Sequence, residues 1–302
     1  MSSSLTWIEL SRAALAHNLN EVRRLVGQRE VLAVVKNNAY GHGAATLCPV
    51  MQDLGVRWFG VARVREAVEL RAVGITANIL NQSFFAADEE EAIVAHDIVQ
   101  ALFRWDDAER LARAAQRQQK VARVHLKVDT GLGRLGVRHD EALDFAKRVL
   151  ALDGLRVEGI FTALTEERDF DREQVRRLQS IADALNIPQL VRHAASSDAV
   201  VEDASTHLDL VRPGIMLYGL HPSDASRRGG KAELLPVLAL KARVGLIKQL
   251  RAGESVGYHR AFVAARDARV AILTIGYGDG IDPTLARAGC VLIRGRRFPL
   301  IS

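Results

Sequence analysis

Segments with a strand pattern alternate with segments with a helix pattern from residue 31 to residue 211, and this alternation restricts the fold more than any other feature. Short apolar, β-branched runs are separated by longer stretches in which apolar residues recur at helical spacing. The predicted strands cover residues 31–35, 58–62, 78–80, 98–102, 121–128, 155–161, 190–194 and 209–211. Nearly eight β/α units over roughly 200 residues predict an α/β chain that folds as a TIM (β/α)8 barrel.

The pattern changes after residue 218. Residues 221–231 are polar and contain glycine, which is typical of a linker. The strands predicted beyond them, at 239–250, 270–273 and 291–293, are separated by the turn sequences AGE, GDG and RGRR, and no helix is expected between them. These features predict a separate antiparallel β domain.

Composition excludes several classes of protein. The 302 residues are 48% apolar, yet no apolar run approaches the roughly 18 to 20 residues of a membrane span, and the first six residues do not resemble a signal peptide. The two cysteines form no disulfide framework or metal pattern, so we expect a cytoplasmic protein without a bound metal. The net charge of +5 is not gathered into tracts, and no nucleic-acid-binding motif is present.

The stretch VLAVVKNNAYGHG contains the most informative single residue, Lys36. Its apolar start predicts a strand buried on both faces, and Lys36 comes where that strand ends and turn residues begin. Active sites of α/β folds gather at the carboxyl ends of parallel strands, where a part-buried lysine can form a Schiff base. At an unperturbed pKa of about 10.4 only about one lysine in 10³ is neutral at pH 7, so a site must lower that value or hold the amine as an imine. The alternative is a lysine that extends from the strand end into solvent.

The segment AVVKNNAYGHG closely resembles the pyridoxal-phosphate (PLP) lysine motif of alanine racemases. The resemblance implies that Lys36 holds PLP as an imine and that Tyr40 contacts the phosphate. Asn37 stands where many family members have alanine. The resemblance covers most of the chain and implies a PLP-binding barrel at residues 11–225, with residues 1–10 joining residues 226–302 in the β domain.

The stretch VHLKVDTGLGRLGV ends a strand in Lys127 and Asp129 and continues through glycines to Arg134. The glycines permit a tight loop that returns the arginine over a strand-end site, where its fork suits a carboxylate, a phenolic oxygen or a phosphate. A surface arginine in a turn is the alternative. The family resemblance implies that Arg134 contacts the PLP 3′-oxygen and the substrate carboxylate. It also implies that Lys127 matches a position that is often carbamylated, whose negative charge would hold Arg134 in place.

The stretch RHAASSDAV offers His193, Ser196 and Ser197 between a strand and a short helix. Serine hydroxyls and free amides at a helix start bind phosphate, although plain N-capping is the alternative. The resemblance assigns His193 to orienting an arginine and Ser197 to the phosphate.

The stretch DLVRPGIMLYG follows the last predicted barrel strand, a position at which many TIM barrels hold phosphate. The backbone amides of Gly214 and Ile215 would face that phosphate, and Arg212 matches the family's arginine opposite the PLP ring nitrogen. An always-charged donor keeps that nitrogen unprotonated, because a proton there would face a cation. Arg212 therefore favours racemisation over decarboxylation, for which a carboxylate would be expected at this place.

Tyr277 lies in the glycine-framed turn of AILTIGYGDG, where a tyrosine with only a packing role is the alternative. The resemblance matches it to the family's second catalytic base, which acts across the dimer interface. Racemisation by two bases needs proton access to both faces of a planar carbanion. Lys36 and Tyr277 of the partner subunit meet that need.

Two departures from the family pattern stand out. Ala163 replaces a histidine that members commonly have after the corresponding strand, so we expect this site to lack one partner of the cofactor. The sequence also stops at Ser302, inside the β domain, before the family's methionine-and-aspartate segment and a later phosphate-binding tyrosine. We therefore expect an incomplete β domain.

These features predict a homodimeric, PLP-dependent racemase that interconverts L- and D-alanine and supplies D-alanine for peptidoglycan. The alternatives are a non-catalytic PLP-binding barrel that stores or delivers the cofactor, and an inactive racemase fragment. A decarboxylase of the same fold is disfavoured by Arg212.

Overall fold

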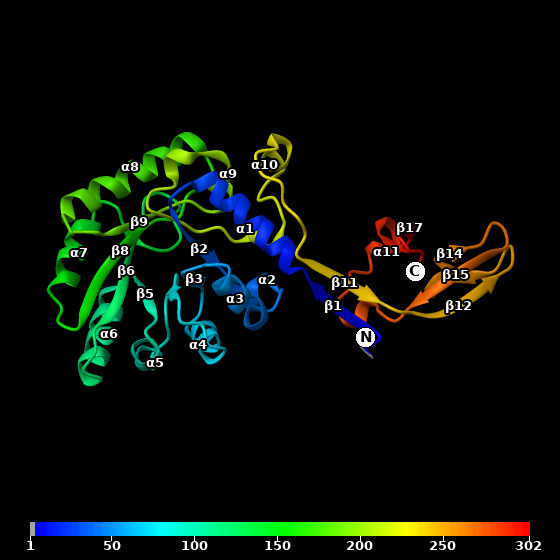
Figure 1. The fold of residues 1–302 in the computed structure, drawn as a ribbon, viewed down its shortest axis with the longest axis horizontal. Coiled ribbons are helices and arrows are strands. Elements are labelled where there is room, and N and C mark those ends of the chain that lie inside the picture. Colours follow the sequence, from blue (N-terminus) through cyan, green and yellow to red (C-terminus); the bar gives the residue numbers. More distant parts are fainter. Residues whose placement is uncertain (1–3) are drawn as a thin grey trace. The chain divides into compact units, whose positions relative to one another are not determined.

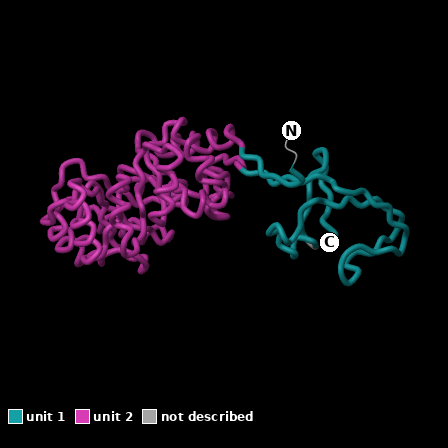
Figure 2. Tube along the Cα trace, turned by 90° about the horizontal axis from the view of Figure 1, so that it is seen from below, with its two compact units in different colours: residues 1–10, 238–302 teal, residues 11–237 magenta. Residues whose placement is uncertain are grey.

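The computed structural model describes residues 4–302, and residues 1–3 of the predicted 1–10 segment lie outside the described part. The chain forms two compact units, which consist of residues 11–237 and of residues 1–10 with 238–302 (Figure 2). We call them the barrel unit and the β unit.

The barrel unit is a closed ring of eight parallel strands, which confirms the predicted fold class. Around the ring the order is β2, β3, β4, β5, β6, β8, β9 and β10, and β10 pairs with β2 to close it. These strands are β2 (Glu30–Val34), β3 (Trp58–Val61), β4 (Asn78–Asn81), β5 (Val99–Leu102), β6 (Ala122–Asp129), β8 (Leu155–Phe161), β9 (Val191–His193) and β10 (Leu210–Val211). The short strand β7 (Val137–Arg138) is added beside β6.

Helices follow the strands and surround the ring (Figure 1). They are α1 (Arg12–Val26), α3 (Ala44–Asp53), α4 (Val64–Ala72), α5 (Glu90–Ala95), α6 (Trp105–Arg117), α7 (Ala142–Leu150), α8 (Arg168–Leu185) and α9 (Ser197–Glu202). Helix α6 illustrates the pattern, because its buried residues recur at helical spacing and include Ala108, Leu111 and Ala115. Strand side chains such as Leu32, Leu80 and Leu210 fill part of the core.

The barrel unit ends at residue 237, later than the boundary predicted at residue 225. The expected linker contains the short helix α10 (Asp224–Gly229). The segment after it is fastened to α1, because the Asn18 side chain donates to the Leu235 carbonyl at 2.8 Å and accepts from the Leu235 amide at 2.8 Å. The sequence pattern of a linker does not reveal such long-range side-chain bonds.

The β unit consists of antiparallel strand pairs. The pairs are β1 (Thr6–Leu10) with β11 (Leu238–Ala242), β12 (Val244–Leu250) with β15 (Ala268–Leu273), β13 (Ser255–Val256) with β14 (Phe262–Val263), and β16 (Cys290–Ile293) with β17 (Arg296–Pro299). The strand predicted at 239–250 is two strands, because the chain changes partner at Arg243 from β1 to β15.

The expectation of no helix in this unit is wrong. The four-residue helix α11 (Leu285–Ala288) follows Thr284, whose amide and hydroxyl both donate to the Asp282 carboxylate. This turn, centred on an aspartate and followed by proline, starts the helix locally. Three-residue 3₁₀ turns also occur at Tyr258–Arg260 and Tyr277–Asp279.

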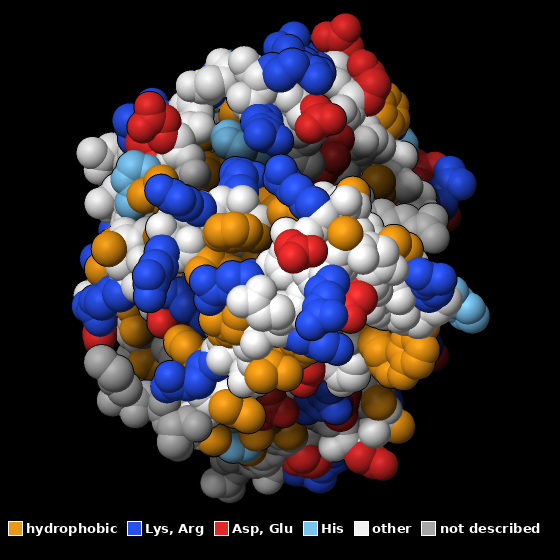
Figure 3. Space-filling model, turned by 90° about the vertical axis from the view of Figure 1, so that its right-hand side faces the viewer, with side chains coloured by type: hydrophobic (Ala, Val, Ile, Leu, Met, Phe, Trp, Pro, Cys, Tyr) orange, Lys and Arg blue, Asp and Glu red, His pale blue; other side chains and the backbone are white. Residues whose placement is uncertain are grey.

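Hydrophobic side chains on the β unit are widely exposed. Figure 3 shows hydrophobic side chains lying between lysine and arginine side chains on the exposed face that it draws. In β12, the neighbouring residues Leu246 and Ile247 are 56% and 53% exposed. Because neighbours in a strand point to opposite faces, both faces of this strand pair are uncovered.

Candidate active site

The candidate residues of the barrel unit follow the carboxyl ends of its strands. Lys36 comes just after β2, Arg134 lies in the loop after β6, His193 is the last residue of β9, and Arg212 comes directly after β10. Lys127 lies near the end of β6. The ring closes β10 against β2, so residues far apart in sequence meet at one end of the barrel.

The turn after Lys36, labelled α2 (Lys36–Tyr40), is left-handed. Asn37, Asn38, Ala39 and Tyr40 all have φ between 54° and 56°. Left-handed backbone is unfavourable for residues with a Cβ atom, and asparagine tolerates it best. Surrounding hydrogen bonds therefore have to hold this turn in place.

Side chains supply two of those hydrogen bonds. The Asn37 amide donates to Glu66 Oε1 at 2.6 Å, and Asn38 Oδ1 accepts from the Ala44 amide at 2.7 Å, which caps α3. The other carboxylate oxygen of Glu66 accepts from the amides of residues 62 and 63, so that β3 and the turn are joined. Glu66 thus fixes the backbone directly after Lys36.

Four cationic side chains lie close enough to influence one another. Burial, together with the charges of Arg212, Arg134 and Lys36, lowers the pKa of Lys127 to about 7, and the charge of Asp129 acts in the opposite direction. Lys127 Nζ donates to the Gln82 carbonyl at 2.8 Å. An excess of positive charge in a partly dry site attracts anionic ligands.

Arg212 is buried and firmly held. Its Nη2 donates to the carbonyls of Thr162 at 2.7 Å and Ala194 at 2.8 Å, and its Nη1 lies 2.9 Å from His193 Nδ1. A guanidinium carries five N–H groups, so these contacts leave two for a ligand. Burial lowers the pKa of Arg212 to about 9, which leaves it charged at neutral pH.

Phe161 forms a wall of this site. Its ring stacks on His193 with centroids 4.6 Å apart and planes 6° apart, and the charged groups of Arg212 and Lys127 lie 5.2 and 5.3 Å from its centroid. The stack fixes the plane of the histidine ring.

Tyr40, Ser197 and Gly214 form a close cradle. A Cβ atom added to Gly214 would lie 2.5 Å from the Tyr40 hydroxyl, so a larger residue there would require the tyrosine side chain to move. The Gly214 amide donates to Ser197 Oγ at 2.9 Å, which leaves the serine proton free to face a ligand. Ser196, which precedes Ser197 in the chain, has a buried Oγ that lacks a hydrogen-bond partner in the part of the chain that the structure describes. An orphaned hydroxyl here points to a bound group with acceptor oxygens.

Within the described chain, Ala163 takes part in hydrogen bonding only through its backbone carbonyl. The Gln174 side-chain amide donates to the Ala163 carbonyl at 3.1 Å and to Thr130 Oγ1 at 3.2 Å. Thr130 Oγ1 in turn lies 2.7 Å from Thr162 Oγ1. The site therefore carries no ring at the place where the family resemblance led us to look for a histidine.

Tyr277 belongs to the β unit, where its side chain is 72% exposed. The turn that carries it is closed by the Gly276 amide, which donates to Asp279 Oδ2 at 3.0 Å. The tyrosine is therefore presented outward on a short, internally bonded turn.

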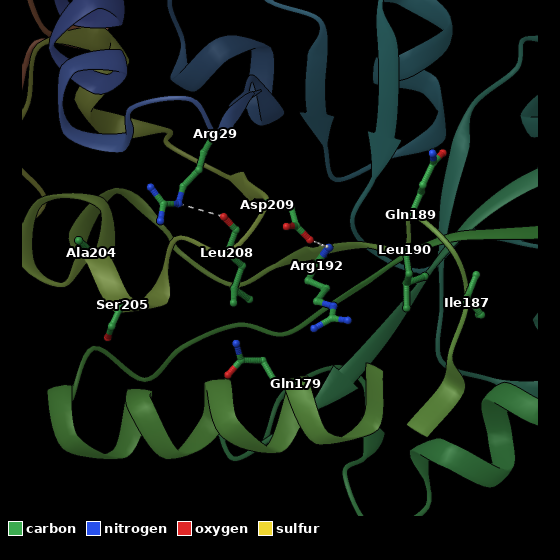
Figure 4. Close-up of a pocket in the computed structure, with 10 residues that line it drawn as sticks. All are labelled: Arg29, Gln179, Ile187, Gln189, Leu190, Arg192, Ala204, Ser205, Leu208 and Asp209. Atoms are coloured by element: carbon green, nitrogen blue, oxygen red, sulfur yellow. Dashed lines mark hydrogen bonds between the residues drawn. The ribbon is translucent and has the colours of Figure 1, made fainter. Parts of the chain in front are cut away.

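A cavity of about 500 Å³ lies at the opposite end of the barrel strands (Figure 4). Its polar groups bind each other: Arg29 Nε donates to the Leu208 carbonyl at 3.0 Å, and the Asp209 carboxylate accepts from the Arg192 amide at 2.8 Å. No candidate residue lines it, and these contacts fasten the amino ends of β2, β9 and β10 to one another. We therefore assign the residues that line this cavity a structural role in the barrel.

Sequence reasoning missed three residues that shape the site, namely Glu66, Phe161 and His125. Glu66 gave a weak signal as an acidic residue in the first turn of a helix. Phe161 and His125 looked like ordinary core residues within strands, and nothing in the sequence distinguished them.

A closed parallel barrel with two lysines, two arginines and a cradle of Tyr40, Ser197 and Gly214 at the carboxyl ends of its strands defines a class: barrel enzymes that act on small anionic molecules. The particular family follows from sequence. Residues 10–222 match the model of the alanine racemase N-terminal domain and residues 237–302 match that of the C-terminal domain. The chain belongs to the alanine racemase family.

Individual relatives agree with this assignment. An alanine racemase of Desulforamulus reducens is 40% identical over 304 residues, which cover 98% of this chain and 82% of the relative. The structure of alanine racemase from Clostridium difficile 630 superposes with a TM-score of 0.91 at 28% identity, over 99% of this chain and 80% of that one. A Bartonella henselae alanine racemase with covalently bound pyridoxal phosphate gives a TM-score of 0.83 at 27% identity, over 98% and 82%. Alanine racemases are isomerases.

Proposed function

We propose that the chain is a PLP-dependent racemase that interconverts L- and D-alanine. The observation that carries this proposal is the meeting of Lys36, Lys127, Arg134 and Arg212 at the carboxyl end of the barrel. A site with this charge suits a cofactor phosphate and a substrate carboxylate at once.

The residues of the barrel unit fit PLP. Ser196 Oγ is a buried hydroxyl without a partner in the described chain, and Gly214 leaves a space that a Cβ atom would fill against Tyr40. Lys36 would hold PLP covalently, while Tyr40, Ser197 and the amides of Gly214 and Ile215 would hold its phosphate. Bound PLP supplies an electron-withdrawing ring that acidifies the α C–H bond of the amino acid.

Proton transfer falls to two side chains. Lys36 Nζ takes or returns the α-proton on one face of the substrate, and the hydroxyl of Tyr277 of the partner subunit serves the other face. The high exposure of Tyr277 in the isolated chain supports a role toward a second copy. We propose a homodimer whose active site is shared between subunits.

Arginines bind and orient the reacting molecule. Arg134 would receive the substrate carboxylate and the 3′-oxygen of PLP. Arg212 would direct one of its two remaining N–H groups at the ring nitrogen and keep it unprotonated, because a proton there would face a fixed cation. This arrangement weakens electron withdrawal, which favours return of the proton over loss of carbon dioxide.

Lys127 is well suited to carbamylation. With a pKa of about 7, much of its amine is neutral at physiological pH. A neutral amine adds to carbon dioxide and releases one proton, which leaves a carbamate with a single negative charge. That charge would balance Arg134 and hold it over the site.

The cellular role follows from the product. D-alanine is a building block of peptidoglycan, and we propose a cytoplasmic enzyme that supplies it. Among the described residues, no helix has the length and apolar character that a membrane crossing needs.

The test is racemisation of L-alanine by the full chain with added PLP, followed on a chiral column. We expect D-alanine to accumulate with wild-type protein and not with Lys36→Ala, whose cofactor absorbance should also be lost. Bound cofactor without turnover would favour the storage barrel or an inactive fragment. The match of residues 237–302 to the C-terminal domain favours the racemase over a barrel that lacks this domain.

A further inference from the structure

A second buried histidine lies behind His193. We propose, on the basis of the function proposed above, that His125 is a positioning residue that fixes His193 and thereby keeps Arg212 aimed at the cofactor ring. The inference rests on two successive contacts in the barrel interior, which join His125 to His193 and His193 to Arg212. We call these three side chains the histidine line.

The line is short and fully buried. His125 Nδ1 lies 2.8 Å from His193 Nε2, and His193 Nδ1 lies 2.9 Å from Arg212 Nη1. All three side chains are inaccessible or nearly so, with exposed fractions of 0%, 0% and 7%. They come from β6, from β9 and from the residue after β10, and β8 lies between β6 and β9 in the ring.

The hydrogen bonds in this line have one direction. Arg212 can only donate, so His193 Nδ1 must accept and the proton of His193 sits on Nε2. That proton is donated to His125 Nδ1, which must therefore be unprotonated as well. His125 thus acts with Arg212 to favour the tautomer of His193 that presents a lone pair to Arg212.

The surroundings keep both imidazoles neutral. Burial, with the charges of Arg123 and Arg212, lowers the pKa of His125 to about 3. Burial, Arg212, His125 and Lys127 lower the pKa of His193 far below its ordinary value. Neither ring gains a proton that would reverse the order of donors.

Packing leaves His125 one position. A Cβ atom added to Gly159 would lie 2.6 Å from its ring, so the space exists only because residue 159 is glycine. On another side the Trp58 ring lies 5.4 Å away, tilted by 48°. The ring of His193 is held in turn by its stack on Phe161.

The line ends at His125. Its Nε2 is buried and has no hydrogen-bond partner among the residues that the structure covers. No onward path for a proton is present within these residues, so the arrangement orients Arg212 rather than conducting protons. Replacing His125 by phenylalanine would remove the unpaired N–H of His125 and would leave the Nε2–H of His193 without an acceptor. The number of unpaired buried donors would therefore not change.

The experiment compares His125→Phe, which removes the acceptor, with His125→Asn, whose side-chain oxygen can take the place of Nδ1. His207→Phe is the matched control, because His207 is also a buried histidine but bonds the Val200 carbonyl and none of the three side chains in the line. The full chain with PLP is labelled with ¹⁵N-histidine, and the ring nitrogen shifts of His193 report its tautomer.

We expect His193 to be a single Nε2–H tautomer in wild type, His125→Asn and His207→Phe, and a mixture in His125→Phe. We also expect kcat for alanine to fall about 10-fold in His125→Phe, as when an orienting partner of a site ligand is removed, with little change in KM. Gly159→Ala, which displaces the ring without removing it, should give the same mixture.

An unchanged His193 tautomer in folded His125→Phe, or equal kcat losses in His125→Phe and His125→Asn, would overturn the proposal. Racemisation by the wild-type chain tests the proposed function separately from the histidine line. The tautomer shifts test the histidine line whether or not the chain turns over alanine, and absence of wild-type turnover would contradict only the proposed function.

Discussion

Among single residues, Gly214 gives the sharpest test of the cofactor cradle. In Gly214→Ala the new methyl group would collide with the Tyr40 hydroxyl at 2.5 Å. The tyrosine must then move from the phosphate site, and we expect PLP affinity to fall about 10-fold, which corresponds to about 1.4 kcal/mol. Titration of the full chain with PLP, followed by its visible absorbance, measures the change.

Gly229→Ala is the control for this substitution, because no atom lies within 4 Å of a Cβ atom at residue 229. It should bind PLP as wild type does. Equal PLP affinity in Gly214→Ala and wild type would remove Gly214 from the cradle.

Because the pKa of Lys127 is lowered in the folded chain, we expect the free energy of unfolding to rise with pH. Its pKa falls from 10.5 in the unfolded chain to about 7 in the folded one, chiefly by burial. Below pH 7 both states are protonated and the folded state bears the full cost of a buried charge. Between pH 7 and 10.5 only the unfolded state binds the proton, so stability rises with pH across this window.

Lys127→Met removes that dependence. In buffer free of carbon dioxide we expect it to increase the free energy of unfolding by a few kcal/mol below pH 7, and the gain should disappear as pH approaches 10.5. Urea unfolding at several pH values measures it. A gain that is constant with pH would mean that Lys127 has an ordinary pKa in the folded chain.

At the scale of elements, the left-handed turn after Lys36 is the least favourable backbone near the site. Asn38→Ala loses both the acceptor for the Ala44 amide and a residue that tolerates φ of 56°. We expect a loss of about 1–2 kcal/mol in the free energy of unfolding. Urea denaturation of the full chain provides the measurement.

Asn37→Gly is the matched control in the same turn, since glycine adopts φ of 54° without strain and the Glu66 contact uses only the backbone amide. We expect a change within about 0.5 kcal/mol. A loss in Asn37→Gly as large as that in Asn38→Ala would mean that side chains other than that of Asn38 stabilise the turn.

Elements differ in how far sequence predicts them. The barrel was predictable because alternating strand and helix periods are local signals, and the strand predicted at 155–161 coincides with β8. The handedness of the turn at Asn37 was not, because it depends on a hydrogen bond to Glu66, 29 residues away. The partner of His125 is 68 residues away in sequence, so its role becomes visible only when β6 and β9 are placed in one ring.

At the scale of the whole molecule, the β unit leaves apolar side chains exposed on both faces of a strand pair. Isolated two-stranded sheets are marginally stable, and the β12–β15 pair exposes Leu246 on one face and Ile247 on the other. Large exposed apolar surface marks an interface with another chain. In the homodimer proposed above, a second copy of this chain would bury such surface, and Tyr277 of the partner subunit would reach the barrel.

Subunit sharing can be tested by mixing two inactive proteins. Lys36→Ala keeps Tyr277, and Tyr277→Phe keeps Lys36, so neither homodimer has a complete site. In a mixed dimer with two-fold symmetry, one of the two sites combines the intact lysine of one chain with the intact tyrosine of the other. If chains pair at random, half of the dimers are mixed and half of their sites are complete, so racemisation should return to about a quarter of the wild-type rate. Unfolding and refolding the two proteins together allows exchange, and mixing without exchange is the control. If Tyr277 served the site of its own chain, the refolded mixture would stay as inactive as its components.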